Sequence, residues 1–146
     1  MAQFWHMMRP PGWWRRSTAD ADWAIDRKFR VRVVKGQWVD PVEHDLDPRR
    51  VFLAVIDRLA GRARHVSVAT HDAALVREAL HRLQTAHITC DVELLYGLPM
   101  KDALAEARVA MVPVRFYVPY GYARAPYRLS TPCESPAHCC GLSATL

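Results

Sequence analysis

The chain has 146 residues, of which 51% are hydrophobic. This is the length of one ordinary domain, with enough apolar material to exclude wholesale disorder. The 20 basic and 15 acidic residues give a formal net charge of +5, but the basic residues form no run longer than a pair. A surface that follows nucleic-acid phosphates needs clustered basic residues, so no nucleic-acid partner is expected. A membrane span needs about 18 consecutive apolar residues, and the sequence contains no such run.

The N-terminal residues and the cysteines indicate where the protein acts. The opening MAQFWHMMRPPGWWRR lacks a small-residue cleavage site and makes a poor signal peptide. Three of the four cysteines crowd the last fourteen residues, whereas Cys90 stands alone. This is not the even framework of a disulfide-stapled domain, so we expect a cytoplasmic protein. The pair Trp13–Trp14 is interpreted as a strand end beside a Pro-Gly turn, with a lipid-interface site as the alternative.

Helix signals recur along the chain. Ser17 is expected to cap a first helix, which ends near Phe29. A second helix begins after Asp47, with a proline at its first position, and Gly61 supplies its stop. Asp72 is expected to cap a third helix with a regular apolar face.

A fourth helix is expected to begin at Pro99. The predicted strands alternate with these four helices, and this order determines the fold class. The strands are rich in branched apolar residues and cover 31–34, 65–70, 90–97 and 112–118. Strands joined by crossover helices form parallel sheets, so the chain is predicted to be α/β with about four parallel strands. Residues 130–146 show no periodicity and are predicted to be a disordered tail, which leaves 1–129 as the folded domain.

Polar and aromatic residues gather where the predicted strands end. Ligands of parallel α/β sheets bind at these carboxyl ends. The residues at this rim are Lys35, Gly36, Gln37, Trp38, Thr70, His71, Asp72, Glu93, Leu95, Tyr96, Gly97, Tyr117, Pro119, Tyr120 and Gly121. Together they suit a flat, anionic ligand. Each also has a structural interpretation: Arg32 and Lys35 are either solvated or paired with Glu93, and His71 either caps its helix or satisfies a backbone carbonyl.

Four segments at these strand ends resemble motifs of the proline dehydrogenase family. RVVKGQW at 32–38 resembles the family's R-L-V-K-G-A-Y, and VATHD at 68–72 resembles its A-T-H-N. DVELLYG at 91–97 resembles E-F-Q-M-L-Y-G, and VRFYVPYG at 114–121 resembles R-V-Y-V-P-Y-G. The segments occur in the family's order. The resemblance implies the C-terminal half of a (β/α)8 TIM barrel.

The resemblance also implies a cofactor and a substrate. The barrel of this family holds FAD, which takes a hydride from the carbon beside the nitrogen of proline; a related cyclic amino acid would react alike. Catalytic roles would fall to Arg32, Lys35 and Tyr117. The cofactor would be bound by Arg32, Val34, Lys35, Gly36, Thr70, His71, Asp72 and Glu93. The substrate would be bound by Trp38, Leu95, Tyr117 and Arg128. The helix N-terminus after Thr70 and His71 would meet the ribityl chain, the diphosphate or the adenosine.

The chain departs from the family in three places, one of which is Gln37–Trp38 in place of Ala-Tyr. Glu93 replaces a glutamine that contacts the flavin, and its carboxylate would disfavour an anionic reduced ring unless Arg32 or Lys35 neutralises it. The arginine pair that holds the substrate carboxylate is replaced by Ser130 and Thr131. Arg128 lies nearby but is offset from the pair.

A complete barrel of this kind has about 250 residues, and four strands supply half of one. We expect either a truncated or divergent fragment, or a homo-oligomer in which a second chain completes the barrel. The alternative function is a catalytically silent half-barrel that acts by protein association. No metal is expected, because the tail residues lack the spacing of a zinc site. Those residues are Cys133, His138, Cys139 and Cys140.

Overall fold

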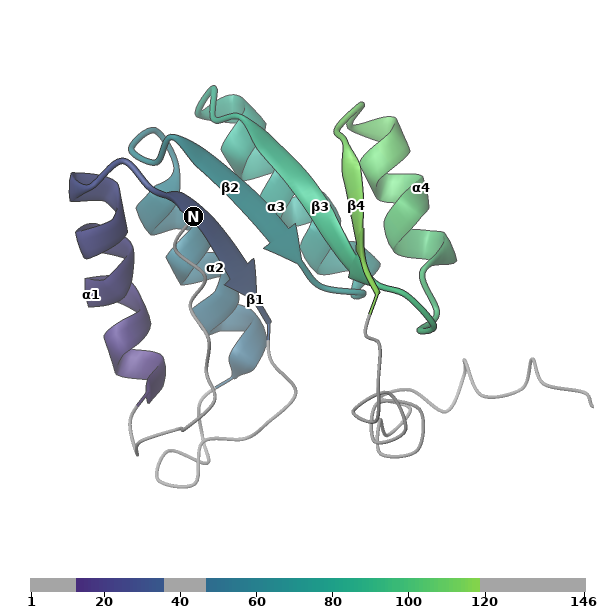
Figure 1. The fold of residues 1–146 in the computed structure, drawn as a ribbon, viewed down its shortest axis with the longest axis horizontal. Coiled ribbons are helices and arrows are strands. Elements are labelled where there is room, and N and C mark those ends of the chain that lie inside the picture. The colour runs from purple at the N-terminus through teal and green to yellow at the C-terminus, as the bar shows by residue number, and fades with distance from the viewer. Residues whose placement is uncertain (1–12, 36–46, 119–146) are drawn as a thin grey trace, which may run out of the picture.

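The computed structural model describes residues 13–35 and 47–118, in which helices and strands alternate (Figure 1). The helices are α1 (Trp13–Asp26), α2 (Pro48–Leu59), α3 (Ala73–Thr85) and α4 (Lys101–Val109). The strands are β1 (Arg30–Val34), β2 (His65–Ala69), β3 (Cys90–Leu95) and β4 (Val114–Tyr117).

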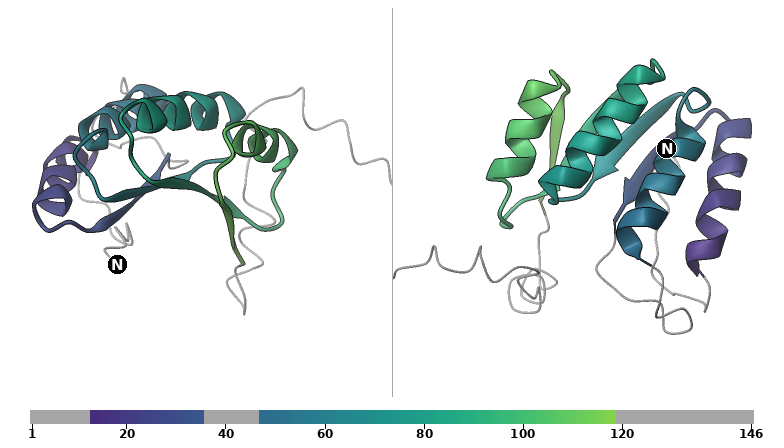
Figure 2. Two further views of the ribbon diagram at one scale, coloured as in Figure 1. Left: turned by 90° about the horizontal axis from the view of Figure 1, so that it is seen from above. Right: turned by 180° about the vertical axis from the view of Figure 1, so that it is seen from behind.

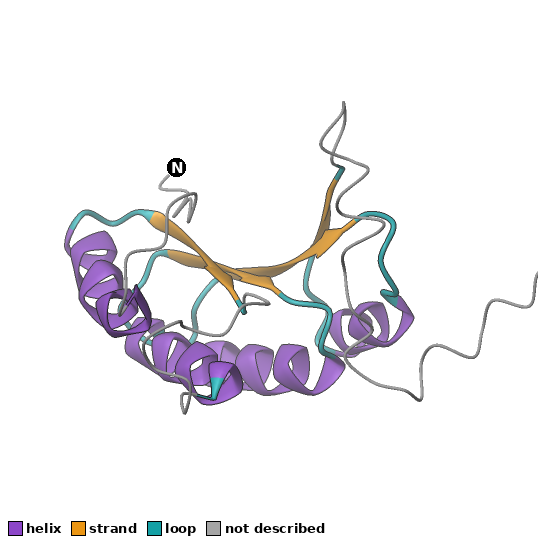
Figure 3. Ribbon diagram, turned by 90° about the horizontal axis from the view of Figure 1, so that it is seen from below, coloured by secondary structure: helices purple, strands orange, loops and turns teal. Residues whose placement is uncertain are grey.

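The four strands form one parallel sheet in the order β1-β2-β3-β4. All four helices lie on one face of this sheet, and the sheet curves so that the face without helices is concave (Figures 2 and 3). The prediction of an α/β chain with four parallel strands and crossover helices is confirmed. The sheet is not closed among the described residues, so the fold alone does not establish a barrel.

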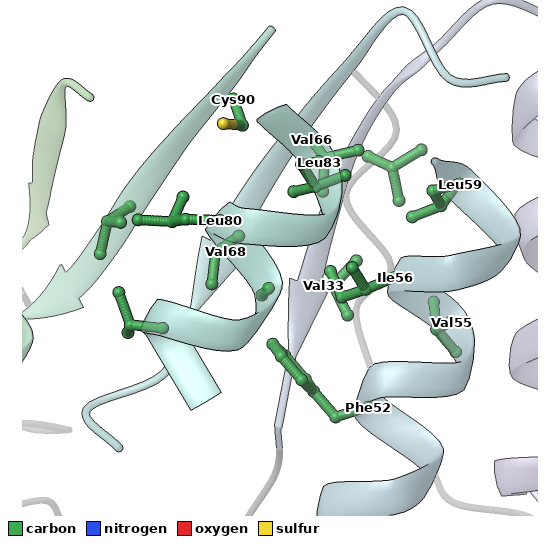
Figure 4. Packing of buried hydrophobic residues seen from close by; sticks show 14 of the residues in the cluster. Val33, Phe52, Val55, Ile56, Leu59, Val66, Val68, Leu80, Leu83 and Cys90 are labelled. Atoms are coloured by element: carbon green, nitrogen blue, oxygen red, sulfur yellow. The ribbon is translucent and has the colours of Figure 1, made fainter. Parts of the chain in front are cut away.

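On the face of the sheet that the helices cover, every second strand residue packs against the helices and is buried. Val33, Val66 and Val68 lie in one hydrophobic cluster with Phe52 and Ile56 of α2 (Figure 4). Burial of each such side chain contributes about 1.5–3 kcal/mol. Further members of the cluster are Val31, Leu59, Leu75, Leu80, Leu83, Val92 and Leu94. This layer holds the helices on the sheet and fixes which strand residues face the opposite way.

The ends of α2 and α3 follow from local sequence. The Asp47 carboxylate accepts the Arg49 N–H at 2.9 Å, and a proline occupies the first turn of α2. The Asp72 carboxylate accepts the Leu75 N–H at 3.2 Å. Gly61 follows α2 with a φ of 71°, a left-handed conformation that favours glycine. The predicted caps of both helices and the glycine stop are confirmed.

The start of α1 differs from the prediction. The helix begins at Trp13, before Ser17, so Ser17 does not cap it and the tryptophan pair is helical rather than the end of a strand. Two arginines lie between the tryptophans and Ser17, and arginine is a good helix former. The helix therefore starts on the N-terminal side of the serine that resembles a cap. Smaller differences occur at α4, which begins at Lys101 rather than Pro99, and at β3, which ends at Leu95.

Some predictions concern residues that the structure does not describe. The predicted tail at 130–146 and the domain end at 129 lie outside the described residues. No helix within 13–35 or 47–118 has the length and hydropathy of a membrane span.

Candidate functional site

The concave face of the sheet carries most of the chain's described site candidates. Because strand side chains alternate, the residues between the core positions point away from the helices. We call this surface the open face. It consists of Arg30, Arg32, Val34, His65, Ser67, Ala69, Asp91, Glu93, Leu95, Arg115 and Tyr117. A barrel interior is usually filled by bulky apolar residues, whereas this face carries five residues of charged types.

Arg32 and Glu93 form an ion pair on the open face. Arg32 Nε donates to Glu93 Oε2 at 2.7 Å, and the Glu93 side chain is 15% exposed. The structure therefore contains the pairing that the sequence left open. It also provides a cation that neutralises Glu93.

Asp72 gathers two cations at the N-terminus of α3. Its Oδ2 lies 2.6 Å from Arg49 Nη1 and 3.8 Å from Lys35 Nζ. Its Oδ1 accepts the Leu75 N–H. The Asp72 carboxylate is thus already the anion at this helix end, where the resemblance implies contact with a ligand such as a diphosphate.

Thr70 and His71 are held by backbone groups of the same region. Thr70 Oγ1 accepts the Asp72 N–H at 3.2 Å. The Leu95 N–H donates to His71 Nε2 at 3.0 Å, so Nε2 is unprotonated and Nδ1–H donates to the Pro99 carbonyl at 2.8 Å. His71 therefore ties the end of β2 to the end of β3. This is the structural role that the sequence left open for it.

Three further candidates lie on the open face near the carboxyl ends of the strands. Val34 is 45% exposed and Tyr117 is 42% exposed, whereas Leu95 is half-buried beside Tyr117 in the β3–β4 pairing. These side chains offer an apolar and aromatic surface next to the Arg32–Glu93 pair. Gly36, Trp38 and Arg128 lie outside the described residues.

A charged cluster on the same face was not predicted from the sequence. Asp91 is 1% exposed, and its Oδ2 lies 2.7 Å from Arg115 Nη2, 3.0 Å from His65 Nε2 and 3.4 Å from Arg30 Nη2. The available signal was an aspartate between apolar neighbours of β3, with basic residues at alternate positions of the other strands. The cluster lies nearer the strand starts than the Arg32–Glu93 pair.

Cys90 does not belong to this site. It points into the hydrophobic cluster and is 6% exposed (Figure 4). Burial, and secondarily the Asp91 charge, raises the pKa of its thiol above the ordinary value. The thiol is therefore protonated and inert at neutral pH. Among the described residues, no group of three or more His, Cys, Asp or Glu residues suits a metal ion.

Comparisons of the chain with protein-family models, with curated proteins and with solved structures found no match.

Proposed function

We propose that this chain is a proline-dehydrogenase-like oxidoreductase that oxidises proline or a related cyclic amino acid with FAD. The main support is the joint placement of the motif residues. Arg32, Val34, Glu93, Leu95 and Tyr117 come from three strands, and the parallel register brings them to one concave face. Motif residues scattered over unrelated surfaces would have spoken against the proposal.

The chemistry of the open face suits the reactive part of a flavin. When bound, the flavin supplies the hydride acceptor, and the protein supplies position and electrostatics. Arg32 would offer its other N–H groups to the reactive edge of the ring, and its 2.7 Å bond to Glu93 holds the guanidinium in place and cancels the carboxylate charge. Val34, Leu95 and Tyr117 would pack against the flat ring and the substrate.

The residues implied for the phosphate end fit less well. Thr70 and His71 are occupied by internal hydrogen bonds, and Asp72 places a carboxylate at the N-terminus of α3. Lys35 and Arg49 are the nearby cations, and both lie against Asp72. We therefore assign the ring to the open face and leave the diphosphate without named partners.

The first test is flavin retention by the purified full chain. The protein is incubated with FAD, passed through a gel-filtration column, and its visible absorption spectrum is compared with that of untreated protein. The proposal predicts retained flavin, and reduced retention in Arg32→Gln. Arg108→Gln, on the exposed surface of α4, is the matched control and should retain flavin normally. A wild-type chain that retains no flavin contradicts the proposal.

A second candidate is the silent half-barrel that associates with a copy of itself. The observation that favours it is the pair of sheet edges: among the described strands, β1 and β4 each have a neighbour on one side only. Phe116 and Val118, in and just after β4, are 50% and 55% exposed. A two-fold axis could place β1 of one copy beside β4 of the other and give eight parallel strands. Light scattering that shows a strict monomer at every concentration contradicts this candidate.

We also propose a reducing, cytoplasmic environment for either function. The sequence lacks a disulfide framework, and Cys90 is a free thiol in the core. Mass spectrometry of the protein from cytoplasmic extracts, with and without reduction, tests this directly. Cysteines recovered as thiols are the expected result.

A further inference from the structure

The Asp91 cluster has an unusual distribution of hydrogen bonds. Arg30, His65 and Arg115 all contact Oδ2 of this carboxylate, and the buried Oδ1 has no partner. The Nε of Arg30 is also buried without a partner. His65 Nε2 cannot both donate to Asp91 and accept from Arg30 Nη2, which lies 3.0 Å away. The cluster is therefore incompletely paired.

The two arginines of the cluster are held differently. Arg115 Nη2 forms an ion pair with Asp91 Oδ2 at 2.7 Å, while Arg30 Nη2 donates one long hydrogen bond to the same oxygen at 3.4 Å, and neither arginine makes the two parallel bonds of a bidentate pair. Their side chains are 42% and 39% exposed on the open face, so part of each guanidinium faces solvent. Asp91 anchors both arginines, yet it leaves donors on each of them for another anion.

The charge of the cluster also favours an anion. Two guanidinium groups face one carboxylate, which leaves a surplus of one positive charge when His65 is neutral. The nearby Arg32–Glu93 pair is neutral as a unit and does not cancel this surplus. A monocarboxylate ligand would balance the charge and accept hydrogen bonds from both arginines.

We propose that Arg30 and Arg115 form the carboxylate-binding end of the substrate site, with Asp91 as their positioning residue. The proposal rests on the function proposed above and names the part of the substrate that these residues recognise. It assigns a carboxylate clamp to the strands of the sheet, whereas the resemblance places one at 130–131, where this chain has serine and threonine.

Strand geometry places this clamp within reach of the proposed flavin surface. Arg115 and Tyr117 are alternate residues of β4, so their side chains leave the strand about 7 Å apart on the same face. On β3, Asp91, Glu93 and Leu95 follow one another at alternate positions of the same face, so Leu95 lies about 13 Å along the strand from Asp91. A small cyclic amino acid held by its carboxylate at Arg115 would extend its ring toward Tyr117.

The experiment measures binding of small ligands to the full chain by titration calorimetry, with and without added FAD. The ligands are tetrahydrofuran-2-carboxylate, which has the ring and the carboxylate; pyrrolidine, which has the ring and the nitrogen; and inorganic phosphate. We expect the carboxylate to bind, and Arg115→Gln to weaken it roughly tenfold to a hundredfold, as for loss of a hydrogen bond between charged groups. Arg115→Lys should bind with intermediate affinity because lysine keeps the charge but not the planar fork.

The control variant is Arg108→Gln, which should bind the carboxylate like the wild type, and circular dichroism confirms that each variant is folded. Unchanged carboxylate affinity in folded Arg115→Gln overturns the proposal, as does phosphate or pyrrolidine binding with equal affinity. Failure of the two proposals is distinguishable. Flavin retention without arginine-dependent carboxylate binding rejects the clamp alone, whereas arginine-dependent carboxylate binding without flavin retention rejects the flavin function and leaves the clamp standing.

Discussion

Replacement of Asp91 by alanine tests whether the charged cluster belongs to the packed structure or is a solvated surface. Asp91 is 1% exposed, and its Oδ2 lies within 3.4 Å of three basic side chains. Its removal leaves Arg30, His65 and Arg115 facing one another without the carboxylate that they share. Breaking a buried ion pair from one side costs about 3–5 kcal/mol.

The expected loss lies at the lower end of that range. Arg30 and Arg115 are 39% and 42% exposed, so water compensates part of the loss at each guanidinium. We therefore expect Asp91→Ala to lower the free energy of unfolding by about 3 kcal/mol. Asp91→Asn keeps an acceptor oxygen but removes the charge, and should cost about 1–2 kcal/mol.

The assay is urea unfolding of the full chain, followed by circular dichroism at several denaturant concentrations. Glu106→Ala is the matched control, because Glu106 also accepts two guanidinium N–H groups, from Arg77, but at the exposed surface between α3 and α4. Glu106→Ala should change the unfolding midpoint far less. If Asp91→Ala and Glu106→Ala shift the midpoint equally, Asp91 is not energetically buried and the reasoning is wrong.

Four other predictions concern single residues. Asp72→Asn removes the negative charge at the N-terminus of α3. The ratio of the affinity for FAD to that for riboflavin, measured by quenching of flavin fluorescence, should therefore rise. An unchanged ratio means that Asp72 does not repel the phosphates. His71→Ala leaves the Leu95 N–H without an acceptor and should cost about 2 kcal/mol in urea unfolding; full stability would show that water replaces the imidazole. In a variant with the other three cysteines replaced by serine, the Cys90 thiol should resist iodoacetamide until urea unfolds the chain, because burial protects it and raises its pKa; rapid native alkylation would contradict its placement. Hydrogen bonding and charge from Arg58 lower the pKa of Asp22, so this pair stabilises the fold above the unfolded-state pKa and loses its effect as the pH falls through the folded-state pKa. Asp22→Asn should therefore reduce the difference in unfolding midpoint between neutral and acidic solution, and an undiminished difference would show that other groups cause it.

The predictable part of the fold depends on local signals. Asp47, Asp72 and Gly61 act within a few residues of their own positions, and the structure bears out all three. The parallel sheet was also predictable, since a strand followed by an amphipathic helix leaves few topologies. Local signals were ambiguous at α1, where Ser17 matches the chemistry of a cap but lies inside the helix.

The site was harder to predict because its contacts are set by sheet register. Asp91 and Arg115 are 24 positions apart in the sequence, and their contact depends on the pairing of β3 with β4. The sequence offered the pairing of Arg32 with Glu93 only as one option, and nothing in the local pattern distinguished it from solvation. His71 illustrates the same limit. Its hydrogen-bond donor is the Leu95 N–H at the end of β3, and its acceptor is the Pro99 carbonyl in the segment that follows.

The polarity of the open face distinguishes between a ligand site and a closed homodimeric barrel. Closure would bring two copies of Arg30, Arg32, Arg115, Asp91 and Glu93 into one enclosed interior, and each copy carries one surplus positive charge among these groups. Desolvation of such charges costs several kcal/mol per ion unless every donor and acceptor is paired, and in each copy Asp91 Oδ1 and Arg30 Nε lack partners. An anionic ligand relieves this cost by supplying an acceptor and a negative charge, whereas a second copy doubles the excess. The charged cluster therefore favours an open sheet face that binds a carboxylate over a closed dimer, and any association of two copies would be expected to use the exposed β4 edge without enclosing this face.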